Sequence, residues 1–183
     1  MGAHLATYSA LIALEGALAL LVVRRTGPHW RDLLSDTPPT TSTLLRDVCI
    51  GAAMWAVWMA FSLFWQHVSP SRAGVVVSAL LPTTAAERAA WILLSCSAGF
   101  AEELAFRGAL QRWAERKTGN AVLAIVIQAL IFGVVHGYQG MAAALRIVVY
   151  GAFFGVVARS RRSLIPGMLA HAWTDIAAGL LRV

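Results

Sequence analysis

The chain is poor in charged residues. Only 13% of its 183 residues are Asp, Glu, Lys or Arg, whereas soluble domains carry about 25%. Its two cysteines, Cys49 and Cys96, both lie in apolar stretches, which excludes a disulfide framework and a cysteine-rich metal site. What it has instead is a hydrophobic share of 58% and a mean hydropathy of +0.67. A water-soluble core of this size does not bury that much apolar surface. We therefore expect residues 1–183 to form a single membrane domain.

Six apolar stretches approach the length of about 20 residues that a helix needs to cross a bilayer. They are Leu5–Val23, Val48–Gln66, Ala89–Leu110, Ala121–Gly137, Ala142–Ala158 and Leu164–Leu181. The fourth and fifth are short. A further apolar run, Ala73–Pro82, has about half the spanning length and is typical of an interfacial or re-entrant segment. The sequence thus predicts an all-α, polytopic bundle of about six spanning helices.

Basic residues are distributed unevenly between the loops. The loops after the first, third and fifth stretches contain ten Arg and Lys residues, and the other loops and the tail contain three. Because cytoplasmic loops carry the excess of Lys and Arg, we expect a multi-pass protein of a bacterial plasma membrane with both termini outside. The net charge of +6 then faces anionic lipid. The expected partners are the bilayer and a membrane-anchored or lipidated protein substrate, and nucleic acid is not expected.

Several ionisable residues fall inside the predicted spans. They are Glu15, Glu102, Glu103, Arg107, His136, Arg146, His171 and Asp175. A charged side chain at the bilayer centre costs about 2.5–3.5 kcal/mol on the insertion scale, so such residues indicate a functional site. The plainer interpretation of each one alone is a hydrogen-bonding strut or a structural ion pair.

The spacing of these residues groups them on helix faces. Glu103 and Arg107 are four residues apart and are expected to form an ion pair. Glu102 is turned by about 100° from Glu103, because an α-helix has 3.6 residues per turn, and is left free of that pair.

Two further pairs have the same spacing. His171 and Asp175 share a face of the last helix, and Phe132 and His136 share a face of the fourth. If the three helices meet, their carboxylates and imidazoles can activate a water for attack on an amide, or hold a divalent metal that does so.

Three motifs now resemble those of a known family. Glu102–Arg107 matches Glu-Glu-x-x-x-Arg, Phe132–His136 matches Phe-x-x-x-His, and His171–Asp175 matches His-x-x-x-Asn/Asp. In this order on separate apolar helices, they resemble the CPBP family of CAAX-processing and bacteriocin-processing proteins. This family, also called the abortive-infection family, includes type II CAAX prenyl proteases and lysostaphin resistance protein A-like proteins. The resemblance covers residues 89–183, and residues 1–88 carry no motif.

The resemblance implies an intramembrane endopeptidase. By it, Glu102 and His136 activate the water, and His171 and Asp175 stabilise the oxyanion. Glu103 and Arg107 orient and balance the site, with Phe132 in a supporting role. The family's substrates are CAAX-type proteins, bacteriocin-type peptides and proteins sorted through a C-terminal membrane anchor. Outward-facing termini would place His136 nearer the outer face, which suits cleavage of an exported protein's anchor.

The third motif departs from the prenyl-protease branch, because Asp175 stands where that branch has Asn. An ionised Asp cannot donate a hydrogen bond to an oxyanion. Asp175 is therefore protonated, orients His171 or binds a metal.

The family has been described both as metalloproteases and as glutamate-type proteases. We favour the metal-free mechanism with no cofactor, because no His-Glu-x-x-His motif is present. In a metal-dependent enzyme the expected ligands, for an ion such as zinc, are Glu102, His136, His171 and Asp175.

Three other functions fit parts of this pattern. A proton-coupled or ion-coupled transporter would use the buried carboxylates as a relay, but neither the inverted repeats nor the broken helices of such proteins are visible. A non-catalytic membrane partner would have no need to keep the motif residues. A transpeptidase using Cys96 would place its nucleophile about 9 Å along the helix from Glu102.

Overall fold

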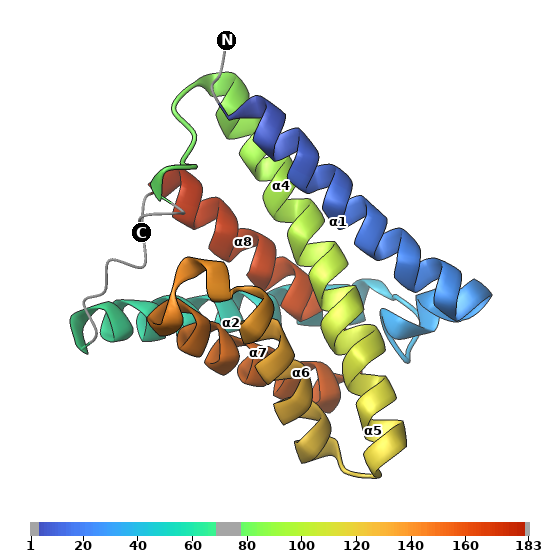
Figure 1. The fold of residues 1–183 in the computed structure, drawn as a ribbon. Coiled ribbons are helices and arrows are strands. Elements are labelled where there is room, and N and C mark those ends of the chain that lie inside the picture. Colours follow the sequence, from blue (N-terminus) through green and yellow to red (C-terminus); the bar gives the residue numbers. More distant parts are fainter. Residues whose placement is uncertain (1–3, 69–77, 182–183) are drawn as a thin grey trace.

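The computed structural model describes residues 4–68 and 78–181, which form helices (Figure 1). In chain order they are α1 (Leu5–Thr26), η1 (Gly27–Leu33), α2 (Thr41–Val68), α4 (Ala85–Glu102), η3 (Glu103–Gln111), α5 (Arg112–Thr118), α6 (Ala121–Val135), η4 (Gly137–Gln139), α7 (Met141–Arg161) and α8 (Ile165–Leu181). No β-strand occurs within these two ranges. The predicted all-α class is confirmed.

Four of the helical stretches are long and apolar enough to cross a membrane. They are α1 with η1, α2, the continuous stretch Ala85–Thr118, and α7. The fourth predicted span is short, as expected, because α6 has 15 residues. The expectation of a short fifth span is wrong, since α7 continues to Arg161 and reaches 21 residues. Part of the run predicted to be interfacial or re-entrant, Ala73–Pro82, lies outside the described residues, which resume at residue 78.

The helix ends follow from local sequence. A capping box starts α4, in which the Thr84 side chain accepts from the Glu87 backbone N–H and the Glu87 carboxylate accepts from Thr84. The Asn120 side chain caps α6. Just before it, Gly119 ends α5 with a φ of 65°, which glycine adopts without steric cost.

The basic loops meet at one end of the bundle. Arg112 pairs with Asp36 at 3.2 Å, and Arg159 pairs with Glu115 at 2.9 Å. These residues belong to three predicted loops: Asp36 follows the first predicted span, Arg112 and Glu115 follow the third, and Arg159 follows the fifth. At the other end, the starts of α1 and α4 lie side by side (Figure 1), where the His4 backbone N–H donates to Glu87 at 3.0 Å. The loops that share basic residues therefore share one side, and which membrane face that side occupies stays a prediction.

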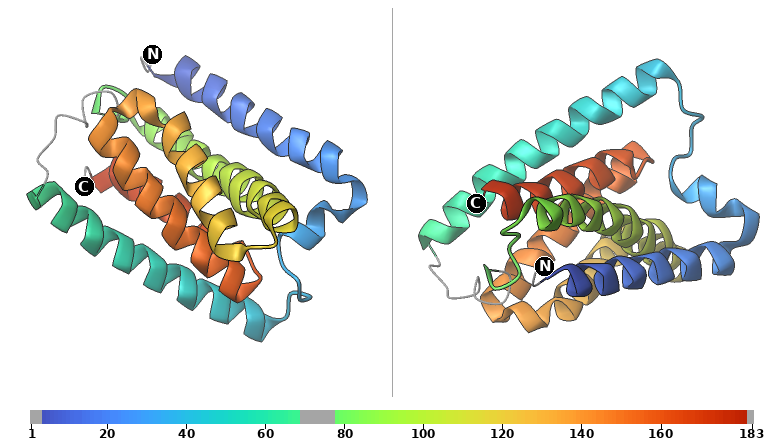
Figure 2. Two further views of the ribbon diagram at one scale, coloured as in Figure 1. Left: turned by 60° about the horizontal axis from the view of Figure 1, so that its bottom comes forward. Right: turned by 90° about the horizontal axis from the view of Figure 1, so that it is seen from above.

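The helix α4 lies between α1 and α8, and α8 also packs on α2, while α6 and α7 form a hairpin (Figure 2). Small residues let these helices approach closely. A Cβ added to Gly99 of α4 would lie 2.8 Å from the Met168 carbonyl oxygen of α8, and one added to Gly151 of α7 would lie 3.0 Å from the Ala129 Cα of α6. These contacts fix α4 against α8 and α6 against α7, and the three motifs begin on α4, α6 and α8.

The helix α4 continues without a break into η3, but its hydrogen-bond pattern changes to that of a π-helix at Glu103. The sequence indicated an ordinary α-helix here. Short π-helical stretches inside α-helices are rare and occur frequently at functional sites. The change falls directly after Glu102, so the two adjacent glutamates of the first motif stand on either side of it.

Candidate active site

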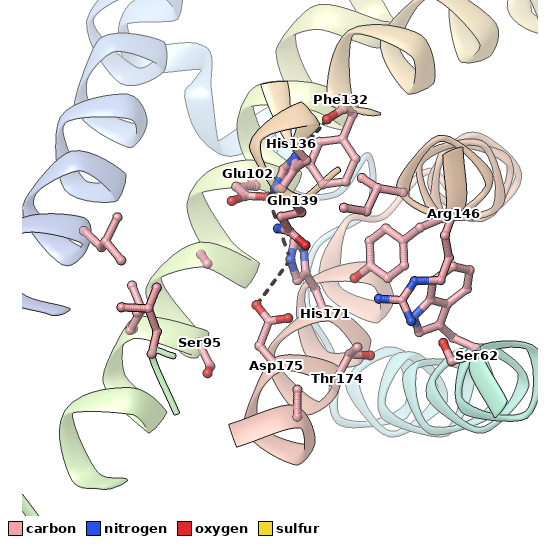
Figure 3. A pocket seen from close by; sticks show the side chains of 18 of the residues that line it. Ser62, Ser95, Glu102, Phe132, His136, Gln139, Arg146, His171, Thr174 and Asp175 are labelled. Carbon is pink, nitrogen blue, oxygen red and sulfur yellow. Dashed lines mark hydrogen bonds and ion pairs between the residues drawn. The ribbon is translucent and has the colours of Figure 1, made fainter. Parts of the chain in front are cut away.

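Glu102, His136 and His171 come from three helices and meet at one point. Glu102 is the last residue of α4, His136 follows α6, and His171 lies in α8. The Nε2 atoms of His136 and His171 lie 3.9 and 3.8 Å from the same oxygen, Oε2 of Glu102. Figure 3 shows the three side chains directed toward one another. The structure thus brings together the residues that the motifs singled out, and their catalytic roles stay a prediction.

A second layer holds this cluster in place. Glu103 and Arg107 are both buried, and Glu103 Oε1 lies 2.9 Å from Arg107 Nη1. The Arg107 guanidinium carbon lies 4.3 Å from the centre of the Phe132 ring, a cation–π contact. The last residue of the first motif is thereby tied to the first residue of the second, which explains why an aromatic residue precedes His136 by one turn.

His171 is oriented by Glu103. Its Nδ1 lies 3.1 Å from Glu103 Oε1, 68 residues away in the sequence. Because a carboxylate paired with arginine only accepts hydrogen bonds, Nδ1 carries the proton. In the neutral ring, Nε2 is then a hydrogen-bond acceptor directed at Glu102.

His136 has a similar arrangement with the main chain. Its Nδ1 lies 2.8 Å from the Phe132 carbonyl oxygen. A carbonyl accepts, so Nδ1 donates, and Nε2 of the neutral ring is again an acceptor that faces Glu102. Two imidazole nitrogens and one carboxylate oxygen therefore offer three acceptors to one small volume.

Asp175 lies one turn beyond His171, as the spacing predicted. Its Oδ2 is 3.6 Å from His171 Nε2, and 38% of its side chain is exposed, compared with 14% for Glu102. Asp175 thus lies beside the His171 imidazole but makes no direct hydrogen bond to it, since 3.6 Å exceeds hydrogen-bond length. The three roles left open for Asp175 stay predictions.

The cluster borders a cavity of about 290 Å³. Glu102, His136, His171 and Asp175 all line it, together with apolar side chains such as Trp58. Leu80, Tyr138 and Gln139 also line it, and they belong to the end of the bundle opposite the basic loops. An internal cavity with convergent polar groups is the usual form of a ligand or substrate site.

Other polar residues also line the cavity, among them Glu15, Arg146 and Tyr150. The sequence marked Glu15 and Arg146 only as charges within apolar stretches and did not place them at this site. It missed Tyr150, because a tyrosine in an apolar helix carries no signal that separates a functional hydroxyl from packing. Cys96 is absent from the lining, and its side chain is exposed on the outer surface of α4.

The metal-dependent alternative names Glu102, His136, His171 and Asp175 as ligands. Within residues 4–68 and 78–181, no group of three or more His, Cys, Asp and Glu side chains is arranged to hold a metal ion. The metal-free mechanism with no cofactor stays a prediction.

Apolar helices around an internal cavity with carboxylate and imidazole groups define an integral membrane protein with an enzyme-like site. The chain belongs to the Rce1-like family, the type II CAAX prenyl endopeptidases, whose family model matches residues 84–177, just over half of its length. It is therefore an integral membrane protease of the CPBP family, as the three motifs indicated. The comparisons with curated proteins and with solved structures give no match.

Proposed function

We propose that this protein hydrolyses a peptide bond of a membrane-anchored or lipidated protein, using a water activated by Glu102 and His136. One observation carries this proposal. Two imidazole nitrogens, of His136 and His171, face the same carboxylate oxygen of Glu102 from 3.9 and 3.8 Å, at the wall of an internal cavity. These separations are too long for direct hydrogen bonds and suit a bridging water.

The proposed reaction begins with a water that donates its hydrogens to Glu102 and to His136 Nε2. As the water oxygen attacks the peptide carbonyl carbon, Glu102 takes one proton and the carbonyl oxygen becomes an oxyanion. The tetrahedral intermediate then collapses, and the carbon–nitrogen bond breaks. Glu102 returns the proton to the leaving amine, which leaves a carboxylic acid and an amine as products.

The Glu103–Arg107 pair acts through His171 in this scheme. Glu103 holds Nδ1 of His171 at 3.1 Å, while Arg107 balances the buried carboxylate at 2.9 Å. Both are positioning residues, because neither lines the cavity. We propose the glutamate-type mechanism without a metal, which the absence of a His-Glu-x-x-His motif favours.

The substrate is proposed to reach the cavity from the bilayer. Apolar side chains, among them Trp58, Met59 and Ile147, line the cavity beside the acidic cluster. They suit an aliphatic or prenyl chain next to the cleaved bond. A prenylated CAAX peptide is accordingly the first probe, followed by a peptide from a C-terminal membrane anchor.

The test uses the full chain purified in detergent micelles and an internally quenched peptide ending in farnesylcysteine and three aliphatic residues. We expect cleavage by the wild type and a loss of about 10³-fold or more in kcat for Glu102→Gln, since the variant cannot accept the proton. His136→Asn is expected to lose about 10²-fold, the low end of general-base contributions.

Matched controls use the same substitutions at the surface. Glu115→Gln breaks the exposed pair with Arg159, and His29→Asn changes a side chain that is 81% exposed. Both should keep the wild-type rate. Full activity of Glu102→Gln would remove this residue from the mechanism, and absence of cleavage of both peptide types by the wild type would contradict the proposed function.

A further inference from the structure

The family resemblance gives oxyanion stabilisation to His171 and Asp175, but in this geometry neither offers a hydrogen-bond donor when His171 is neutral and Asp175 is ionised. His136 and His171 use Nδ1–H to bind a carbonyl and a carboxylate, so their Nε2 atoms are acceptors when the rings are neutral. Ionised Glu102 and Asp175 are acceptors as well. Catalysis of acyl transfer needs a donor aimed at the developing oxyanion.

Tyr150 supplies an uncommitted donor at this cavity. The residue is 5% exposed and lines the same cavity as the acidic cluster. Its hydroxyl has no hydrogen-bond partner within the ranges that the structure describes. A buried hydroxyl without a partner is unfavourable, and a tyrosine that is buried usually finds one.

The Tyr150 ring is held rigidly. It stacks on Phe154 with ring centres 3.9 Å apart, and Trp58 packs edge-on at 4.7 Å. The His171 ring lies 5.3 Å away at an angle of 74°. The Tyr150 ring is therefore fixed beside the imidazole that faces Glu102.

We propose that the Tyr150 hydroxyl donates a hydrogen bond to the carbonyl oxygen of the cleaved peptide bond and stabilises the oxyanion. This inference rests on the proposed function and adds a catalytic residue to it. It also gives the cavity two chemically distinct walls. The acceptors of α4, α6 and α8 bind and activate the water, while α7 presents a donor to the carbonyl oxygen.

The experiment compares wild type, Tyr150→Phe and the surface control Glu115→Gln with the farnesylated peptide. Phenylalanine keeps the ring contacts and removes only the hydroxyl. We expect kcat of Tyr150→Phe to fall about 100-fold, the usual effect of losing one oxyanion donor, with KM within a factor of two and an unchanged or higher melting temperature. Glu115→Gln should match the wild type, because Glu115 pairs with Arg159 outside the cavity lining.

Two results would overturn the inference. A Tyr150→Phe variant with at least half of the wild-type kcat shows that the hydroxyl is not used. A drop in kcat together with a drop in melting temperature assigns it a structural role. Equal rates in wild type and Glu102→Gln would instead contradict the proposed function, and the role of Tyr150 with it.

An independent observation concerns Arg146, one turn before Tyr150 on α7. It lines the cavity, yet within the described part of the chain no hydrogen bond or ion pair holds its guanidinium. The acids that share the cavity, Glu15, Glu102 and Asp175, come from α1, α4 and α8. Figure 3 shows Arg146 on the side opposite Glu102 and Asp175. An arginine within an apolar helix is costly unless an anion or water compensates it.

We infer that Arg146 binds the α-carboxylate of a substrate whose C-terminus lies close to the cleaved bond. Arginine recognises carboxylates through two parallel hydrogen bonds, and the acidic walls repel an anion from the rest of the cavity. Four residues of α-helix rise about 6 Å, so a carboxylate held by Arg146 lies within a few residues of a carbonyl held by Tyr150. This inference also rests on the proposed function. It restricts the substrate to proteins or peptides that are cleaved close to their own C-terminus.

Its test uses paired farnesylated peptides that end in a free acid or in an amide. We expect the wild type to bind and cleave the acid at least tenfold better, and Arg146→Gln to treat both alike. Binding is also measured with the Glu102→Gln variant by fluorescence anisotropy, so that the preference is visible without turnover. Equal affinity of the wild type for acid and amide overturns the inference. A second result also overturns the inference: activity that depends on anionic lipid in the wild type but not in Arg146→Gln. That result would show that the arginine binds a lipid headgroup.

Discussion

Glu103 Oε1 lies 3.1 Å from His171 Nδ1, and this contact joins the first and third motifs of the chain. The same oxygen lies 2.9 Å from Arg107. One buried carboxylate thus neutralises a buried cation and sets the orientation of an imidazole at the same time.

This double role predicts a large effect of Glu103 on stability. Glu103→Leu leaves the buried Arg107 without its counter-charge, and removing one partner of a buried pair costs about 3–5 kcal/mol. The free energy of unfolding, measured in mixed micelles by titration with a denaturing detergent, should fall by that amount. The double variant Glu103→Leu/Arg107→Leu should recover much of it, because no charge remains unpaired. A single variant as stable as Glu115→Gln would show that the pair is not buried as described.

Phe132 is predicted to stabilise Arg107 through its ring. Phe132→Leu keeps an apolar side chain but removes the cation–π contact at 4.3 Å, which is expected to cost about 2 kcal/mol at a desolvated site. The same unfolding titration measures it. The control is Phe64→Leu, at a side chain that is 60% exposed, where a change within about 0.5 kcal/mol is expected. Equal effects at both positions would contradict a specific role of the ring.

Gly99 is predicted to set the distance between Glu102 and His171. An alanine Cβ there would approach the Met168 carbonyl oxygen to 2.8 Å and the Ala172 nitrogen to 3.0 Å, so α8 must move away from α4. Because an error of about 1 Å in a catalytic geometry costs about 10²-fold in rate, Gly99→Ala should lose activity on that scale. Gly16→Ala is the control, since nothing lies within 4 Å of its added Cβ. An active Gly99→Ala variant would show that this contact does not position the site.

Chelators are predicted to leave the peptidase activity unchanged. The described histidine and acidic side chains form no group arranged for a metal ion, and the proposed mechanism needs none. Cleavage of the farnesylated peptide should continue at the wild-type rate after dialysis against a strong chelator. Loss of activity that Zn²⁺ restores would contradict the glutamate-type mechanism and make the cluster a metal site.

The basic loops are predicted to face the cytoplasm, and the turn between α6 and α7 the outside. In a Cys49→Ser/Cys96→Ser background, Met141→Cys should react with a membrane-impermeant maleimide added to intact cells. Lys117→Cys should react only after the membrane is opened. The reverse pattern would invert the orientation and place the cavity entrance on the cytoplasmic side.

Much of the architecture was predictable because a helix that crosses lipid must satisfy its own backbone and needs a continuous apolar run. The spacing rule likewise gave the Glu103–Arg107 pair and the shared face of His171 and Asp175. The length of α7 was underestimated, because Arg159 and Arg161 in its last turn resemble a loop. The π-helical stretch after Glu102 was missed, since no residue pattern announces it.

The sequence by itself determined which residues are apolar enough for the membrane, where the helices break, and which side chains share a helix face. Tertiary structure alone decided that Glu103 holds His171 and that Arg146 stands opposite the acids. It also decided that the Tyr150 hydroxyl has no hydrogen-bond partner among the described residues. The physical reason is that lipid is as apolar as the protein interior. Helices in such surroundings carry no polar stripe that reveals their inward face, so rotation and depth are set only by the packing of helix against helix.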